Sequence, residues 1–172
     1  MSDKFKTDLK QGLEAEKIVS EILTAKGILN FPLCQFDGAT NGNGGPKIWG
    51  YNSGLVCPDL ICFDPPTGKA FFIEVKSRAE PRTFMQQKEF TLDEYKYNSY
   101  LKVQEVTGSR VWLAFYDRSK KTVYLGKINE YTRTWDGKKG GKLVNDYTVY
   151  YWDVSKLKGL YKPRPDEIES FL

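Results

Sequence analysis

Asp59, Glu74 and Lys76 are the residues of this chain whose types and spacing most clearly suggest chemistry. Asp59 follows Pro58 at the start of a short apolar run, and Glu74 and Lys76 lie in a second run beyond a proline-glycine turn. Carboxylate oxygens are the ligands that hard divalent cations prefer, and a nearby lysine can stand beside a phosphate. The three residues therefore indicate metal-dependent cleavage of a phosphodiester bond.

The two runs are predicted to form a β-hairpin that brings these residues together. Both are short and rich in β-branched and aromatic residues, and the prolines and glycine between them favour a turn. If Asp64 faces Lys69 across a four-residue loop, the antiparallel register sets Asp59 opposite Glu74, with Cβ atoms about 4.5–5.5 Å apart. Two carboxylates so close repel each other, and a divalent cation between them would resolve the repulsion.

Alternation along the second run sorts its side chains onto two faces. Glu74 and Lys76 share one face, and the other face points toward the expected core with Phe71, Ile73 and Val75. Acid-x-lysine pairs also occur by chance, at 8–10, 94–96 and 136–138. The first two lie in predicted helices, where residues two apart do not face each other, and the third lies in a glycine-lysine loop. The plain alternative for Glu74 and Lys76 is a solvated ion pair on an exposed edge strand.

Composition limits the possible functions. With 172 residues, the chain is expected to form a single domain over 1–172 with a substantial core. No apolar run approaches the length that crosses a membrane, and residues 1–6 do not predict a signal peptide, so no membrane partner is expected. Cys34, Cys57 and Cys62 lack Cys-x-x-Cys spacing, which favours reduced thiols in a cytoplasmic protein. The absence of histidine excludes His-metal nucleases and Ser-His-Asp triads, and leaves carboxylates and lysines for catalysis.

Basic residues concentrate beyond position 117, although the net charge is only +4. The stretch 118–142 holds eight lysines and arginines against two acids, with aromatic residues interleaved. Such a stretch suits a phosphate-backbone partner, and an ordinary solvated surface is the alternative. The candidate nucleic-acid contacts are four lysines of this stretch and one from the glycine-rich loop: Lys120, Lys121, Lys138, Lys139 and Lys47.

Two helices are expected around the hairpin. A helix over 4–26 ends at Gly27 and carries an apolar stripe of Leu9, Leu13, Ile18, Val19, Ile22 and Leu23. A second helix over 91–107 begins at Thr91, with Glu94 completing a capping box, and ends at Gly108.

The remaining segments alternate between strands and loops. Strands are expected over 28–36, 111–116, 122–128 and, as the last, 147–152. Loops are expected over 37–54, 78–88 and 136–142, and a tail over 154–172. The glycine-rich 37–54 lacks the Gly-Lys-Ser/Thr ending of a phosphate-binding loop. The order α-β-β-β-α-β-β-β predicts an α/β fold with a mixed central sheet flanked by helices.

Pro58-Asp59 followed by Glu74-Val75-Lys76 on the next strand resembles the PD-(D/E)xK nuclease superfamily, whose restriction-endonuclease-like fold has an αβββαβ core. The similarity spans roughly 10–116, and a basic β extension is expected over about 117–172. Gly12 and Glu16 in the first helix are similar to the Gly-x-x-x-Glu helix of archaeal-type Holliday junction resolvases. The sequence of residues 74–78, Glu-Val-Lys-Ser-Arg, is also resolvase-like.

The resemblance implies a role for each matching residue. Asp59 and Glu74 would ligate Mg²⁺, or Mn²⁺ as its substitute, with help from the backbone carbonyl of Val75. Glu16 would reach the same ion directly or through a water, although an exposed, salt-bridged glutamate is the alternative. Lys76 would orient and help to deprotonate the attacking water. Arg78, on the same strand face as Glu74, is a candidate contact for the scissile phosphate, with an exposed strand-end arginine as the alternative.

The function that these features predict is a divalent-metal-dependent DNA endonuclease. Its setting could be recombination and repair, as for a Holliday junction resolvase, or restriction, or a phage or mobile element. The alternatives are a catalytically inactive nucleic-acid-binding module of the same fold and a nuclease acting on RNA or single strands. Resolvase-like nucleases often carry a glutamine near the start of the helix after the catalytic strand. Gln86 and Gln87 come earlier in this chain, so whether either takes the place of that glutamine is open. Formation of a homodimer is also left open.

Overall fold

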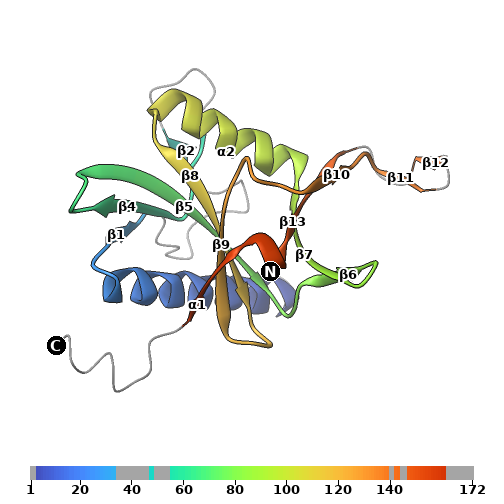
Figure 1. Ribbon diagram of the computed structural model, residues 1–172, viewed down its shortest axis with the longest axis horizontal. Coiled ribbons are helices and arrows are strands. Elements are labelled where there is room, and N and C mark those ends of the chain that lie inside the picture. The colour runs from blue at the N-terminus through green and yellow to red at the C-terminus, as the bar shows by residue number, and fades with distance from the viewer. Residues whose placement is uncertain (1–2, 34–46, 49–54, 140–141, 144–146, 162–172) are drawn as a thin grey trace.

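The central feature of the computed structural model is a six-stranded mixed sheet with the order β1-β4-β5-β8-β9-β14 (Figure 1). The structure describes residues 3–33, 47–48, 55–139, 142–143 and 147–161. Strands β5 and β8 are parallel, and the other neighbouring strands are antiparallel. The six strands are β1 (Leu29–Pro32), β4 (Leu60–Asp64), β5 (Lys69–Arg78), β8 (Arg110–Asp117), β9 (Thr122–Lys127) and β14 (Lys158–Tyr161).

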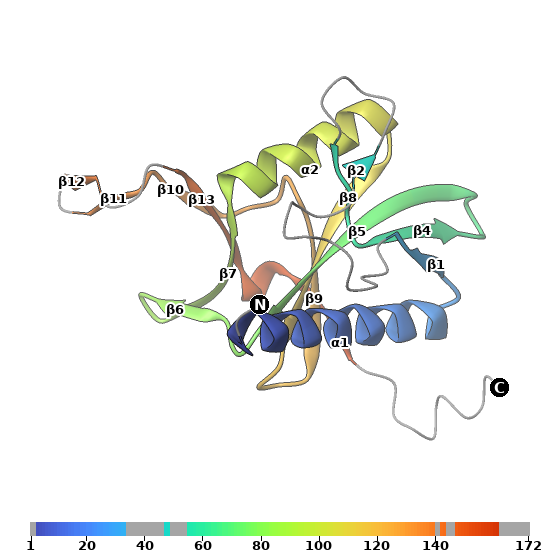
Figure 2. The same ribbon diagram turned by 180° about the vertical axis from the view of Figure 1, so that it is seen from behind.

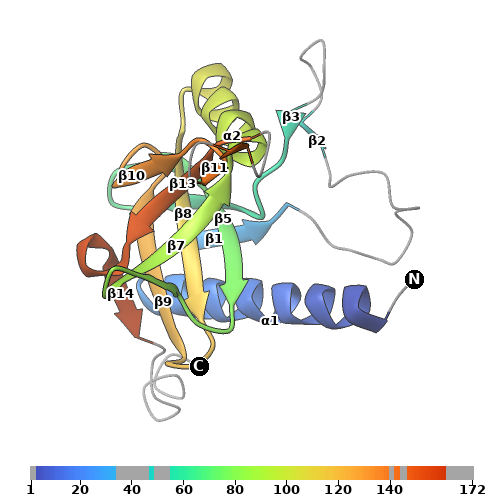
Figure 3. The ribbon, with the colours of Figure 1, turned by 90° about the vertical axis from the view of Figure 1, so that its right-hand side faces the viewer.

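Each face of this sheet is covered by a different layer. Helix α1 (Asp3–Ala25) packs on one face, and α2 (Glu94–Thr107) packs on the other, as Figure 3 shows edge-on. A second sheet, of order β10-β13-β7-β6, lies beside α2; its strands are β10 (Arg133–Trp135), β13 (Val149–Asp153), β7 (Gln87–Asp93) and β6 (Arg82–Phe84). Two short pairs complete the described strands: β2 (Lys47–Ile48) with β3 (Leu55–Val56), and β11 (Lys138–Lys139) with β12 (Lys142–Leu143). The predicted α/β fold with a mixed central sheet is confirmed.

The predicted register of the central hairpin is confirmed. Asp64 pairs with Lys69, and Leu60 pairs with Ile73, so Asp59 directly precedes the strand at the level of Glu74. Ile73 and Val75 join the core beneath α1, as the alternation predicted. Because β5 lies between β4 and β8, the hairpin is in the interior of the sheet.

Helix α1 buries a narrower stripe than its sequence predicted. Ile18, Val19, Ile22 and Leu23 are buried against the sheet, but Leu13 is 38% exposed. Leu13 is one turn from the candidate site residue Glu16, where the helix borders a cavity instead of the core. Among the described residues, neither helix carries an apolar stretch long enough to span a bilayer.

The predicted start of the second helix was wrong. Thr91 lies in β7 and pairs with Tyr151, and α2 begins at Glu94 after Asp93. The Glu94 carboxylate accepts a hydrogen bond from the Thr148 N–H at 3.0 Å, instead of completing a capping box. Pairing with the distant strand β13 therefore replaces the local cap. The predicted end is confirmed, since Gly108 follows Thr107 in the left-handed conformation.

Three further expectations were wrong, because segments expected to be irregular pair as strands, two in local hairpins and one with a distant strand. The segment 78–88, expected to be irregular, contains β6 and the start of β7, which form a hairpin. The expected loop 136–142 contains β11 and the start of β12, and the expected tail contains β14, which pairs with β9 and closes the central sheet. Most of the glycine-rich segment 37–54, and residues 34–36 of the expected first strand, lie outside the described residues.

Candidate active site

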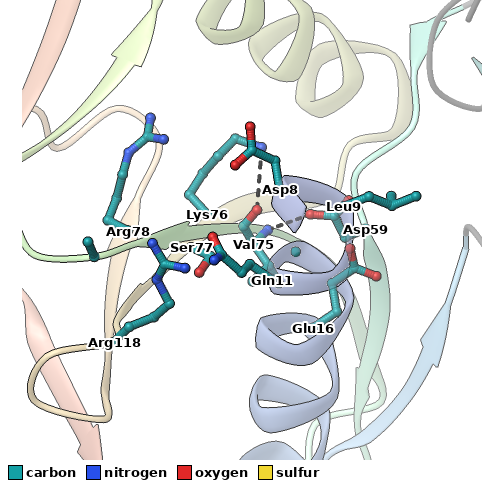
Figure 4. A pocket seen from close by; sticks show the side chains of 12 residues that line it. Asp8, Leu9, Gln11, Glu16, Asp59, Val75, Lys76, Ser77, Arg78 and Arg118 are labelled. Carbon is teal, nitrogen blue, oxygen red and sulfur yellow. Dashed lines mark hydrogen bonds between the residues drawn. The ribbon is translucent and has the colours of Figure 1, made fainter. Parts of the chain in front are cut away.

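A cavity of about 440 Å³ lies between the first half of α1 and the end of β5 (Figure 4). Helix α1 packs against β5 through buried apolar side chains. Asp59 enters the cavity from the start of β4, and the turn between β8 and β9 closes the far side. Its lining comprises Asp8, Leu9, Gln11, Gly12, Glu16, Asp59, Val75, Lys76, Ser77, Arg78, Ala79 and Arg118.

Asp59 is fixed by the neighbouring strand. The backbone N–H of Val75 donates a hydrogen bond of 2.7 Å to Oδ2 of Asp59. The carbonyl oxygen of Val75, the predicted backbone ligand, lies 3.3 Å from Nζ of Lys76 and accepts its hydrogen bond. One peptide segment therefore links the predicted acid to the predicted lysine (Figure 4).

Glu74 and Lys76 form a buried ion pair. Nζ of Lys76 donates to Oε1 of Glu74, whose residue is only 3% exposed. Oε2 of Glu74 is buried and has no hydrogen-bond partner among the described residues. An exposed pair on an edge strand is thereby excluded, since β5 is interior and both side chains are largely covered. A buried carboxylate oxygen without a donor is costly, and it is the kind of atom that a cation would satisfy.

Two carboxyl groups of the site, those of Glu16 and Asp59, have raised pKa values. Burial raises the pKa of Glu16 from 4.5 to about 7, and repulsion from Glu74 adds to this shift. Attraction to Lys76 acts in the opposite direction. Burial, followed by repulsion from Glu74, raises the pKa of Asp59 well above its ordinary value. Attraction to Lys76 and the hydrogen bond from Val75 act to lower this pKa, but they are outweighed. The structure thus brings together Glu16, Asp59, Glu74 and Lys76, which the sequence had proposed as one site.

Two lysines at or near the site have pKa values shifted by their surroundings. Burial acts to lower the pKa of Lys76, but attraction to Glu74 and Asp59 outweighs burial, and the pKa is raised. Repulsion from Lys76, followed by burial, lowers the pKa of Lys96 on α2. Lys96 belongs to the acid-x-lysine pair at 94–96 that the sequence analysis set aside. Lys96 therefore adds positive charge near the site from helix α2. The spacing of acids and lysines in the sequence did not indicate this position.

Arg78 and Arg118 lie on the opposite side of the cavity from Glu16 and Asp59 (Figure 4). The N–H of Arg118 donates to the carbonyl of Arg78 at 2.9 Å, so the turn after β8 is joined to the end of β5. Buried Asp117 orders this turn, because its Oδ1 accepts from the N–H and hydroxyl of Ser119. Nε of Arg118 is buried without a partner among the described residues.

Arg118 and Asp8 are cavity residues that the sequence analysis did not assign to the site. Asp117 followed by Ser119 is a signal for an ordered turn. Which cavity the turn borders depends on the parallel pairing of β5 with β8, whose register sets Arg78 beside Asp117. Asp8, half of another pair that was set aside, reaches the cavity because α1 lies along it.

The predicted nucleic-acid lysines are not gathered at the cavity. Lys120 and Lys121 lie in the β8–β9 turn, just beyond Arg118, and are exposed without lining the cavity. Lys47 lies in β2, and Lys138 and Lys139 form β11, which projects from the body of the molecule (Figures 1 and 2). The structure does not describe the side chains of these last three residues.

No set of three or more aspartate, glutamate, cysteine or histidine side chains within the described ranges has the arrangement of a complete cation site. Glu16, Asp59 and Glu74 are close enough to perturb one another's protonation, but Lys76 holds one oxygen of Glu74. Glu16, Asp59, Lys76 and two arginines line one cavity, and Glu74 lies buried against Lys76.

Comparisons with known proteins bear on the fold. No protein-family model matches the chain, and no curated protein sequence matches it. The Holliday junction resolvase Hjc of Archaeoglobus fulgidus, an archaeal hyperthermophile, is similar in structure with a TM-score of 0.53 and 14% identity, over 84% of this chain and 85% of that chain. A nuclease from a fusselovirus is similar with a TM-score of 0.47 and 13% identity, over 100% of this chain and 98% of its own. The chain therefore has the restriction-endonuclease-like fold that its motifs predicted.

Proposed function

We propose that this chain is a divalent-metal-dependent nuclease that hydrolyses DNA phosphodiester bonds in the cavity between α1 and β5. The observation that carries the proposal is the buried pair of Glu74 and Lys76, whose lysine lines the same cavity as Glu16, Asp59, Arg78 and Arg118. A fold alone does not define an activity, so the proposal rests on these side chains.

The residues fit a divalent cation. Glu16, Asp59 and Glu74, with the carbonyl of Val75, would hold Mg²⁺ or Mn²⁺, since hard cations take carboxylate and carbonyl oxygens. Oε2 of Glu74 is buried and has no donor in the part of the chain that the structure describes, and the raised pKa values of Glu16 and Asp59 reflect burial and the neighbouring negative charge of Glu74. When bound, the cation would polarise the phosphate and lower the pKa of a bound water.

The chain's own residues would complete the reaction. Lys76, held by Glu74 and the Val75 carbonyl, keeps its proton and would offset the negative charge that develops on the phosphate. Arg78 and Arg118 would bind the oxygens of the scissile or adjacent phosphate, because guanidinium groups suit phosphate geometry. The acids on one side and the arginines on the other would hold the phosphate between them.

An inactive binding module is the second candidate, and the site disfavours it. The carboxyl groups of Glu16 and Asp59 in the cavity, with Glu74 buried beside Lys76, would repel an approaching phosphate unless a cation joined them. Proteins that only bind DNA gain nothing from such acids. Resolution of four-way junctions is the first specific activity to test, because the similar archaeal structure is that of a Holliday junction resolvase.

The experiment is cleavage of a DNA panel in the presence of Mg²⁺ or Mn²⁺. Four-way junctions, flaps, plain duplexes and single strands are compared, with an RNA strand added. Glu74→Ala and Lys76→Ala are expected to reduce cleavage by at least about 100-fold while DNA binding remains. Lys102→Ala and Glu105→Ala, which break an exposed ion pair of 2.9 Å on α2, serve as matched controls. Undiminished activity of Glu74→Ala, or activity in excess EDTA, would contradict the mechanism.

A further inference from the structure

A second, larger cavity of about 910 Å³ lies at the other end of α1 from the candidate active site. It opens where α1 ends, because the helix covers only part of the sheet face that it packs against. Trp112 of β8 and Leu125 of β9 are half-buried in its floor, beside Phe71 of β5 and Leu160 of β14. The floor is therefore apolar and aromatic, and it shares no residue with the first cavity.

The rim of this cavity is basic. Its four cations come from four separate elements: Lys26 after α1, Lys69 at the start of β5, Arg110 at the start of β8 and Lys158 at the start of β14. All four are exposed, and none forms an ion pair with another residue in the described part of the chain. The acid of the rim, Asp64, accepts a hydrogen bond of 2.6 Å from the Thr67 hydroxyl. The rim thus has an excess of unneutralised positive charge.

Part of this charge has an ordinary explanation. Lys26 and Arg110 follow the ends of α1 and α2, where the helix dipole favours cations. Lys69 and Lys158 lie on strands, and this explanation does not apply to them. Exposed cations around a half-buried tryptophan suit a single strand of nucleic acid, since phosphates meet the cations and a base stacks on the ring, where it would displace Nζ of Lys127, 5.7 Å from the ring centroid. A duplex keeps its bases stacked inside, so only an unpaired segment can place a base in the cavity.

We propose that this cavity binds a single-stranded segment of the nucleic acid that the proposed nuclease cleaves, with phosphates at Lys69, Arg110 and Lys158 and a base against Trp112. The proposal rests on the proposed function. From Glu16 to Ala25, α1 advances by roughly 14 Å at about 1.5 Å per residue, so one strand can contact both cavities. Cavities of about 300–1,000 Å³ hold drug-sized ligands, so this cavity suits one or two nucleotides.

The test is photo-crosslinking of a thymidine oligonucleotide that carries 5-iodouracil, in EDTA so that no strand is cut. Mass spectrometry is expected to place the crosslink at Trp112 or an adjacent residue, and Trp112→Phe is expected to reduce it. The triple variant Lys69→Ala, Arg110→Ala and Lys158→Ala should weaken oligonucleotide binding by roughly 10- to 50-fold at about 0.15 M salt. Its salt slope should fall by about 2, because each single-strand phosphate contact contributes about 0.7.

A matched triple variant controls for net charge. Lys17→Ala, Lys102→Ala and Lys156→Ala remove three exposed lysines that lie near acidic side chains elsewhere, and should leave the crosslink and most of the affinity unchanged. Thermal unfolding confirms that both triple variants fold. A crosslink elsewhere, or equal weakening by the two triple variants, would overturn the proposal. So would an acidic peptide that binds here while the oligonucleotide does not.

These outcomes separate this site from the nuclease proposal. Cleavage without a crosslink at Trp112 would remove the second site and leave the nuclease function standing. A crosslink at Trp112 without cleavage in any metal would support the binding site and overturn the nuclease function.

Discussion

Replacing Glu16 with glutamine is expected to stabilise the metal-free protein at alkaline pH, although Glu16 is a candidate functional residue. Burial and repulsion from Glu74 raise its pKa to about 7, against an ordinary 4.5. The folded state therefore binds this proton more tightly than the unfolded chain does. The resulting stability is complete below about pH 4.5 and is lost as the pH rises through about 7.

The size of the effect follows from the two pKa values. A difference of about 2.5 pH units corresponds to about 3.4 kcal/mol at 1.36 kcal/mol per unit. Glu16 is only half-buried, so solvent screening reduces this figure to about 1–2 kcal/mol. For a chain of this size, 1 kcal/mol changes the Tm by roughly 2–4 °C. We expect the Glu16→Gln variant to match the wild type near pH 4 and to melt about 3–6 °C higher at pH 8.5.

The assay is thermal unfolding by circular dichroism in EDTA, from pH 4 to pH 8.5, with the difference in Tm between variant and wild type as the readout. Glu14→Gln, an exposed change on the same helix, is the matched control and should give a constant difference. Adding Mg²⁺ at pH 8.5 should stabilise the wild type more than Glu16→Gln, because binding to the folded state alone raises stability. A pH-independent difference for Glu16→Gln would refute the reasoning.

Three changes away from the cavity test the packing. Arg133→Met should cost about 3–5 kcal/mol in urea unfolding, because it leaves the 1% exposed Glu89 without its two hydrogen bonds of 2.9 and 2.6 Å; a loss under 1 kcal/mol would contradict this. Gly126→Ala should cost about 1–2 kcal/mol in the same assay, since a Cβ there would lie 2.5 Å from Leu157 Cδ2, and an unchanged midpoint would show that Leu157 moves freely. Gln86→Gly should raise stability by about 0.5–1 kcal/mol, because Gln86 has a φ of 68°; a decrease would show that the side chain contributes more than the backbone strain costs.

Local patterns predicted the central hairpin and its register. The turn at 64–69 and the alternation of β5 depend on neighbouring residues, so the register that brings Asp59 to Glu74 could be read from the sequence. The end of α2 was also predictable, because a glycine after the helix adopts a left-handed conformation at low cost. Thr91 was misplaced because its strand pairs with Tyr151, 60 residues away, and no local signal reveals that partner.

The sequence by itself determined which residues can do chemistry: Asp59, Glu74 and Lys76 on a hairpin, with Glu16 on the first helix and no histidine to compete. Tertiary structure decided how those residues behave. The interior position of β5 buries Glu74 and excludes a solvated pair, and burial, not spacing, raises the pKa of Glu16. Parallel pairing of β5 with β8 brings Arg118 to the cavity, because it aligns strand ends that lie about 40 residues apart in the chain.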